Sequence, residues 1–279
     1  PARALSLGAA LAVLVVVLSS CGTGAGGSRA GGPPPSSGPA TTASPASSGP
    51  CVHAAIPAYF DPQSSLYWRV LTSGTGPAPY WVIINPNNGP GSAAQADYQN
   101  AVTAARQAGE HVLGYVLTGY GRRSPADVAT DVARYHSWYG VNSIFFDEAP
   151  VKAAYLGAYQ GYVASVHAHG GRAVLNPGTV PDRGYFSFAD AVVTFESPAS
   201  AYVKDPHRPG ALVGIPSSRI WNIVVNTPPA LLARVIGVAQ SRHAGFLYAT
   251  DGIEPDPYNT LPSYWAQELA SASATCAGP

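Results

Sequence analysis

The stretch Ser143-Ile144-Phe145-Phe146-Asp147-Glu148 contains the pattern that decides the fold, a short apolar run that ends in acidic residues. Short apolar runs recur along the chain, and longer polar or amphipathic segments separate them. Strands of a parallel sheet that is covered on both faces have this continuous apolar character. The pattern therefore predicts eight parallel strands, at Ala54–Phe60, Tyr80–Ile84, Val112–Leu117, Ser143–Phe146, Arg172–Leu175, Ala191–Phe195, Ile220–Val225 and Gly245–Ala249.

The segments between these runs are candidate helices. The weakest candidate follows Arg172–Leu175. Eight alternating strand and helix units predict an α/β fold closed into a single-domain (β/α)8 TIM barrel over residues 51–279. An open doubly wound sheet is the alternative, but the first strand is followed by Tyr59-Phe60-Asp61-Pro62 and not by a Gly-rich phosphate loop. The predicted helices are Gln95–Ala108, Pro125–Tyr139, Ala153–Ala168, Pro229–His243 and Leu261–Ala274.

The N-terminal residues resemble a targeting signal. Arg3 precedes the apolar run Leu5–Leu18, which has the length of a signal-peptide core and is short for a membrane span. The run ends in Leu18-Ser19-Ser20-Cys21, which resembles the lipobox of bacterial lipoproteins. We expect residues 1–21 to be a signal peptide with lipidation at Cys21, the only membrane contact, on the extracellular side of the bacterial cell membrane. An ordinary secretory signal, and hence a secreted protein, is the alternative.

Residues 22–50 consist almost entirely of Gly, Ser, Pro, Thr and Ala. A segment of this composition cannot bury enough apolar surface to offset its ordering entropy. We therefore expect a flexible linker that holds the folded domain away from the membrane.

The charge balance restricts the class of partner. Lys and Arg together number 15, as do Asp and Glu, and the basic residues form no cluster. This argues against nucleic acid, and it favours a neutral substrate. The 16 Tyr and 5 Trp residues suit contact with sugar rings, although they also suit ordinary packing. We expect a polysaccharide partner and a monomer.

Cys51 and Cys276 flank the predicted barrel. Cys51 precedes the first strand and Cys276 ends the last helix, so both positions fall near the N-terminal face of a closed barrel. Because an exported chain meets an oxidising compartment, we expect a disulfide between them. Two free thiols are the alternative.

Acidic residues stand where three of the predicted strands end. Asp147 and Glu148 follow the fourth strand, Glu196 ends the sixth and Asp251 follows the eighth. Active sites of such barrels lie at the C-terminal ends of the strands, which makes these residues candidates for catalysis or substrate binding. Helix capping is the simpler alternative, more natural for Asp than for Glu. Parity with the polar Thr194 predicts that Glu196 points to the barrel mouth.

Parity with Ser143 predicts the same orientation for Asp147. Glu148 would then reach the mouth only if the strand has already ended.

Further polar residues lie at other strand ends. Three Asn residues begin Asn-Pro or Asn-Thr-Pro sequences. Because Asn and Pro are common turn residues, a purely structural role in turns is the alternative. Four Tyr residues could stack on sugars. The predicted binding residues are Asn85, Asn176, Asn226, Tyr59, Tyr115, Tyr120, Tyr248 and Asp251.

We expect neither a metal nor another cofactor. His167 and His169 lie two positions apart in a helical segment and face different sides, and no Cys pair has zinc spacing.

Six ordered motifs resemble the spherulation-specific protein 4 (spherulin-4) family, which is related to glycoside hydrolase family 135. The resemblance covers nearly all of residues 55–200 and is looser after Glu196. It implies a (β/α)8 barrel and, as for characterised fungal members, endo-hydrolysis of α-1,4-linked N-acetylgalactosamine in galactosaminogalactan. The family's acidic residues correspond to Asp147, Glu148 and Glu196. The motifs are Ile56-Pro57-Ala58-Tyr59-Phe60, Asn85-Pro86-Asn87-Asn88-Gly89-Pro90-Gly91, Gly114-Tyr115-Val116-Leu117-Thr118-Gly119-Tyr120-Gly121, Phe145-Phe146-Asp147-Glu148, Leu175-Asn176-Pro177-Gly178-Thr179 and Thr194-Phe195-Glu196.

The resulting hypothesis is an exported glycoside hydrolase with two catalytic carboxyl groups. Glu196, on a largely apolar strand, is the candidate general acid and base, Asp147 the nucleophile, and Glu148 an orienting or stabilising group. The two main roles could also be exchanged. Carboxyl groups about 5 to 5.5 Å apart would indicate retention, and a gap above roughly 6.5 Å inversion. A cell-surface protein that binds a polysaccharide without cleaving it is the alternative function.

Overall fold

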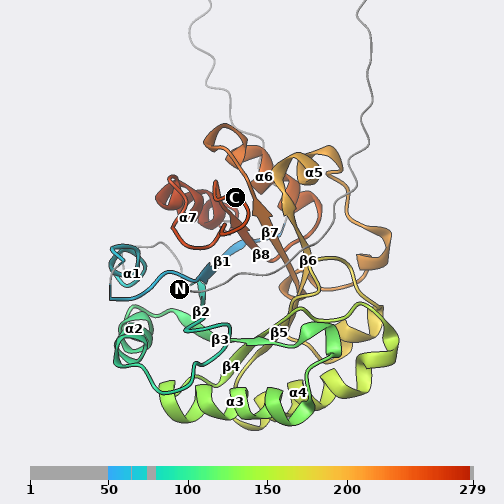
Figure 1. Ribbon diagram of the computed structural model, residues 1–279. Coiled ribbons are helices and arrows are strands. Elements are labelled where there is room, and N and C mark those ends of the chain that lie inside the picture. Colours follow the sequence, from blue (N-terminus) through green and yellow to red (C-terminus); the bar gives the residue numbers. More distant parts are fainter. Residues whose placement is uncertain (1–49, 64, 74–79, 277–279) are drawn as a thin grey trace, which may run out of the picture. The chain divides into compact units, whose positions relative to one another are not determined.

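The computed structural model describes residues 50–63, 65–73 and 80–276. Eight parallel strands form a closed barrel in which each strand pairs with the next, and helices lie outside the strands (Figure 1). The pairs His53 with Phe246 and Ala54 with Leu247 join the first strand to the last. The predicted TIM barrel is therefore confirmed and the open sheet is wrong. The predicted signal peptide, Cys21 and all of the linker except residue 50 lie outside the described residues.

The strands match the predicted apolar runs, with ends that differ by a few residues. Their buried side chains on both faces explain why the runs are continuous in sequence. The strands are β1 His53–Ala58, β2 Trp81–Ile84, β3 His111–Leu117, β4 Ser143–Asp147, β5 Ala173–Leu175, β6 Ala191–Pro198, β7 Ile220–Val225 and β8 Phe246–Ala249.

The five predicted helices are present, three of them beginning three or four residues later than predicted, and the short helices α1 and α5 were not predicted. α3 has its predicted bounds because the sequence contains both end signals. Ser124 accepts a hydrogen bond from the Asp127 N–H, Pro125 occupies the first turn, and Gly140 ends the helix with a φ of 65°. After β5 there is only a short 3₁₀ segment, Arg183–Ser187. The helices are α1 Tyr67–Leu71, α2 Ala96–Gln107, α3 Pro125–Tyr139, α4 Leu156–Ala168, α5 Ala199–Lys204, α6 Leu232–Ser241 and α7 Trp265–Ala274.

Aromatic rings fill the barrel interior. The Trp221 ring on β7 lies 6.1 Å from Trp81 on β2 and 5.5 Å from Phe145 on β4, and Trp81 lies 4.5 Å from Phe246 on β8. Side chains from strands that are not neighbours can meet in this way only inside the barrel. The interior is thus a packed core, and a ligand can reach the strands only from their ends.

The predicted disulfide between Cys51 and Cys276 is present, so the free-thiol alternative is wrong. It joins the residue before β1 to the end of α7, across 225 positions of sequence. Closing so long a loop is expected to stabilise the fold by about 2 to 5 kcal/mol. Within the described ranges, no helix is both long and apolar enough to cross a membrane.

Candidate active site

Asp147 and Glu196 lie together at the C-terminal end of the barrel, and the Asn176 amide bridges them. Asn176 directly follows β5, between the strands that hold the two acids. Its Nδ2 donates to Asp147 Oδ1 and to Glu196 Oε2, each at 2.7 Å. Because both bonds meet at one nitrogen, these two oxygens lie at most twice that length apart, about 5.4 Å.

The backbone fixes the orientation of the Asn176 side chain. The Gly178 N–H donates to Asn176 Oδ1 at 2.9 Å, so the amide must turn its two N–H groups towards the carboxyl groups. Asn176 is also held by its own backbone, which donates to Phe146 O and accepts from the Ala149 N–H. The Asn-Pro-Gly turn predicted from the sequence thus has a structural role, and its first residue joins the two acids.

A β-bulge aims Glu196 into the mouth. Val193 pairs with Trp221 and Phe195 with Asn222, so Thr194 is the extra residue on β6. Thr194 does not point towards the barrel axis, although the parity argument for Glu196 requires that it does. Its hydroxyl accepts a hydrogen bond from Asn222 Nδ2, and Asn222 in turn accepts one from Tyr202 of α5. The predicted orientation of Glu196 is correct, but it results from the bulge and not from parity with Thr194.

Each carboxyl group also accepts a hydrogen bond from a tyrosine. Tyr115 on β3 donates to Asp147 Oδ2 at 2.7 Å, and Tyr258, in the loop after β8, donates to Glu196 Oε1. Tyr59, which follows β1, packs edge-on against both rings, at 5.6 Å from Tyr115 and 5.5 Å from Tyr258. Three tyrosines that contact one another therefore surround the two acids, and two of them hold the carboxyl groups in place by hydrogen bonds.

Burial raises the pKa of both acids, and the Asp147 charge adds to the rise at Glu196. Burial, and then the Asp147 charge, raise the pKa of Glu196 to about 7, while hydrogen bonds from Tyr258 and Asn176 oppose the rise. Burial also raises the pKa of Asp147, opposed by hydrogen bonds from Tyr115, the Glu148 backbone and Asn176. Two nearby carboxyl groups that repel one another favour a state in which one is protonated and the other ionised.

Glu148 lies beside this pair, just past the end of β4. Its φ of 50° confirms that the extended strand has ended, which was the condition for its side chain to reach the mouth. The Glu148 carbonyl accepts from the Tyr120 N–H at 2.6 Å and from Thr118 Oγ1 at 3.0 Å. Burial and the Asp147 charge raise the pKa of the Glu148 side chain, and Arg122 lowers it.

Tyr120 presents an open ring at the same edge. It is 48% exposed, has a φ of 55°, and the Arg122 guanidinium lies 5.5 Å from its ring centre. A ring held in this way is available for stacking.

Several predicted binding residues have structural partners away from the carboxyl pair. Asn85 accepts from the Gly89 N–H at 3.0 Å, which is a turn contact. The Asn226 backbone donates to Gly252 O, and its side chain is exposed. Asp251 accepts from the Ser263 hydroxyl at 2.5 Å and from its N–H, just before α7. The turn and capping alternatives therefore account for the observed contacts of these three residues.

The prediction of Tyr248 as a stacking surface is wrong. Its side chain is 0% exposed and packs against Tyr258 and Trp265, at 6.3 and 6.4 Å between ring centres. Tyr258 is the residue that the sequence prediction missed. It lies within a Pro-rich loop and meets Glu196 across 62 positions of sequence, and no local pattern signals such a contact.

Among the described residues, the only group with the spacing of metal ligands is Cys51, His53 and Cys276, whose two sulfurs form the disulfide. These three residues lie before or within β1 and after α7, and not at the strand ends that hold Asp147 and Glu196.

The sequence profile of spherulation-specific family 4 matches residues 53–272, which include every strand of the barrel. The chain belongs to this family. Spherulin-4 of Physarum polycephalum is 34% identical to this family member over 208 residues, which are 69% of this chain and 61% of that protein. The chain thus spans less than two thirds of that relative.

The barrel of this spherulin-4 family member is also similar to a solved structure, Aspergillus clavatus Sph3 in complex with GalNAc. The TM-score is 0.70 at 24% identity, with 81% of this chain and 98% of that chain covered. At 24% identity this similarity is evidence for the barrel fold alone.

Proposed function

We propose that this protein is a glycoside hydrolase that cleaves internal glycosidic bonds of a galactosamine-containing polysaccharide. The observation that carries the proposal is the pair of carboxyl groups, Asp147 and Glu196, bridged by one amide at the open end of the barrel. Sph3, which shares the fold, was crystallised with GalNAc, and this supports the choice of sugar.

Glu196 is assigned as the general acid and base. A group with a pKa near 7 can give a proton to the leaving oxygen at neutral pH and later take one from water. Asp147 is assigned as the nucleophile, because three hydrogen bonds favour its ionised form. Attack at the anomeric carbon then forms a glycosyl-enzyme ester as the glycosidic bond breaks.

The separation of the acids supports retention of configuration. The two oxygens that share Asn176, Asp147 Oδ1 and Glu196 Oε2, lie at most about 5.4 Å apart, which is compatible with the separation of about 5 to 5.5 Å between the carboxyl groups of retaining enzymes. Water therefore attacks second, after the ester has formed. Glu148, beside Asp147, orients or stabilises the substrate.

The test is the release of reducing ends from polymers of α-1,4-linked N-acetylgalactosamine. The wild-type protein should produce new reducing ends, and Glu196→Gln should not. Arg134→Gln, a change of a partly exposed residue on α3, is a matched control that should keep full activity. If the wild-type protein binds the polymer in a sedimentation assay but releases no reducing ends, the protein is a binding module and the hydrolase proposal is wrong.

We also propose that the protein is exported and tethered through Cys21. The support is the lipobox-like sequence Leu18-Ser19-Ser20-Cys21 after an apolar run. In a bacterial host the wild-type protein should fractionate with the membrane, and Cys21→Ser should not. Wild-type protein free in the medium would instead indicate an ordinary secretory signal.

A further inference from the structure

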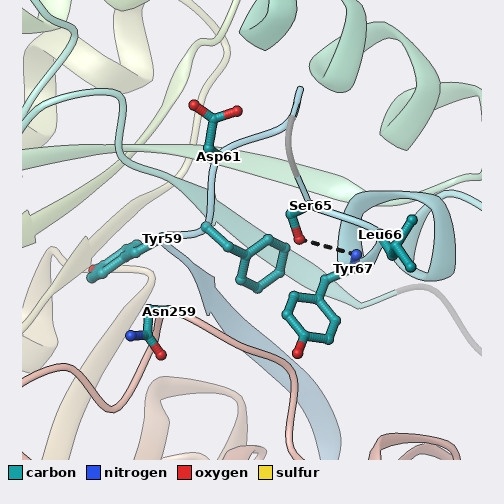
Figure 2. A pocket seen from close by; sticks show the side chains of 7 residues that line it. Tyr59, Asp61, Ser65, Leu66, Tyr67 and Asn259 are labelled. Atoms are coloured by element: carbon teal, nitrogen blue, oxygen red, sulfur yellow. Dashed lines mark hydrogen bonds between the residues drawn. The ribbon is translucent and has the colours of Figure 1, made fainter.

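A hollow of about 500 Å³ lies between the segment after β1 and the loop after β8. Tyr59, Phe60 and Asp61 line it from the end of β1, Leu66 and Tyr67 from the start of α1, and Asn259 from the loop after β8. Figure 2 shows the Tyr59 and Tyr67 rings and the Asn259 amide around the same space. Its size falls within the range of small-molecule sites.

The hollow and the surroundings of the candidate active site share one residue, Tyr59. Tyr59 belongs to both, because its ring packs on Tyr115 and Tyr258, the two tyrosines that donate to the acids. The Tyr59 N–H also donates to Tyr258 O at 3.3 Å, which ties the two segments together. Asn259 is the residue next to Tyr258. The hollow therefore adjoins the tyrosines that contact the acids, and a ligand that extends from the acids past Tyr59 would lead towards it.

Local contacts hold the walls in place. Phe60 and Tyr67 pack edge-on at 5.3 Å, and the Trp68 indole N–H donates to Phe60 O at 2.9 Å. Ser65 Oγ accepts from the Tyr67 N–H at 3.0 Å, a bond drawn in Figure 2. Much of the hollow thus exists before a ligand arrives, which reduces the ordering cost of binding.

The lining suits a sugar and does not suit an anion. It combines aromatic rings with an exposed amide at Asn259 and a carboxylate at Asp61, and the described lining residues include no Lys, Arg or His. Rings provide stacking surfaces for the apolar faces of sugars, and amide and carboxylate groups bond to hydroxyls. Leu66, which is 63% exposed, adds an apolar edge that a bound chain would cover.

We propose that this hollow is a subsite for a further sugar residue of the polysaccharide whose scissile bond lies at Asp147 and Glu196. The inference rests on the proposed function and deepens it, because a subsite outside the cleavage point makes the enzyme favour long chains. Sugar residues beyond the scissile bond then contribute binding free energy that short oligomers lack.

The test compares kcat/KM for long and for the shortest cleavable α-1,4-linked N-acetylgalactosamine oligomers in the full chain. Asn259→Ala and Tyr67→Ala should each lower the value for long oligomers about tenfold, equivalent to roughly 1.4 kcal/mol, and leave the short oligomer unchanged. Asp256→Ala, an exposed change in the same loop but outside the hollow, is the matched control and should alter neither. If Tyr67→Ala fails to fold, Asn259→Ala alone decides the result.

Equal kcat/KM ratios for long and short oligomers in wild-type, Asn259→Ala and Tyr67→Ala proteins would overturn the subsite while leaving the hydrolase intact. A second arm measures the Kd of the same oligomers by calorimetry in a Glu196→Gln background, in which chemistry is blocked. There the long oligomer should bind about tenfold more weakly when Asn259→Ala is added. An unchanged Kd would contradict the subsite, and a wild-type protein that cleaves neither oligomer would contradict the proposed function separately.

Discussion

Two pairs of acids with raised pKa values differ in what surrounds them. At the barrel mouth, Asp147 and Glu196 share the Asn176 amide and each accepts a tyrosine hydroxyl. Elsewhere, Glu110 accepts the Tyr80 N–H at 2.6 Å and Glu268 accepts the Ala249 N–H at 2.7 Å. Each of these two carboxylates accepts a hydrogen bond from one backbone N–H and from no side chain among the described residues.

Burial raises the pKa in both sets, to about 7 for Glu110 and about 8 for Glu268. A raised pKa therefore does not distinguish a catalytic acid from a structural one in this barrel. The distinguishing features are a second acid within reach, side-chain donors on both, and access from the mouth. Glu268 is 1% exposed and no substrate can touch it, whereas Asp147 and Glu196 are only partly buried.

The largest effect should come from removing Asp147, the proposed nucleophile. Asp147→Ala should lower kcat about 10³-fold or more, because the ester can no longer form. Added azide should restore part of the rate and yield a glycosyl azide, detected by mass spectrometry, since a small anion can occupy the space of the lost carboxylate. Azide should have no such effect on Glu110→Ala. Wild-type rates in Asp147→Ala would remove Asp147 from the chemistry.

Loss of the bridge should have the next largest effect. Asn176→Ala should lower kcat/KM about 10²-fold, because neither acid keeps its position. The Asn176 hydrogen bonds lower the pKa of both acids, so their loss raises both pKa values, and both limbs of the pH profile should move to higher pH. A loss of activity with an unmoved profile would indicate that Asn176 has only a structural role.

A smaller effect is expected at Tyr258. Its hydrogen bond lowers the pKa of Glu196, so Tyr258→Phe should raise that pKa above about 7 and move the alkaline limb of kcat/KM to higher pH. The acidic limb, set by Asp147, should stay in place, and the rate at the optimum should fall only severalfold. Tyr185→Phe, whose hydroxyl donates to Lys152 O, is the control and should leave both limbs unchanged.

Glu268→Gln should change stability and not activity. Because the folded pKa is raised from 4.5 to about 8, the folded state keeps a proton that the unfolded state loses, and the free energy of unfolding falls as pH rises through this window. Thermal melts of the wild-type protein should show this fall, and Glu268→Gln should flatten it. A steeper pH dependence in the variant would contradict the assigned pKa.

The sequence predicted what local patterns determine. The α3 bounds follow from Ser124, Pro125 and Gly140, and the strand ends placed Asp147 and Glu196 at one edge of the barrel. Contacts between distant segments were not predictable. The bulge at Thr194 depends on the register with β7, and Tyr258 reaches Glu196 from a loop without a periodic pattern. Tyr248 was misplaced because an apolar strand does not reveal which rings another loop will cover.

The measurement that tests the account most directly is kcat/KM on one N-acetylgalactosamine polymer for Asp147→Asn, Glu196→Gln, Glu110→Gln and Glu268→Gln side by side, each with its Tm. The first two should lose about 10³-fold while they remain folded, and the last two should stay within a fewfold of the wild-type value. Equal losses in all four variants, or full activity in Glu196→Gln, would contradict the assignment of the mouth pair as the catalytic acids.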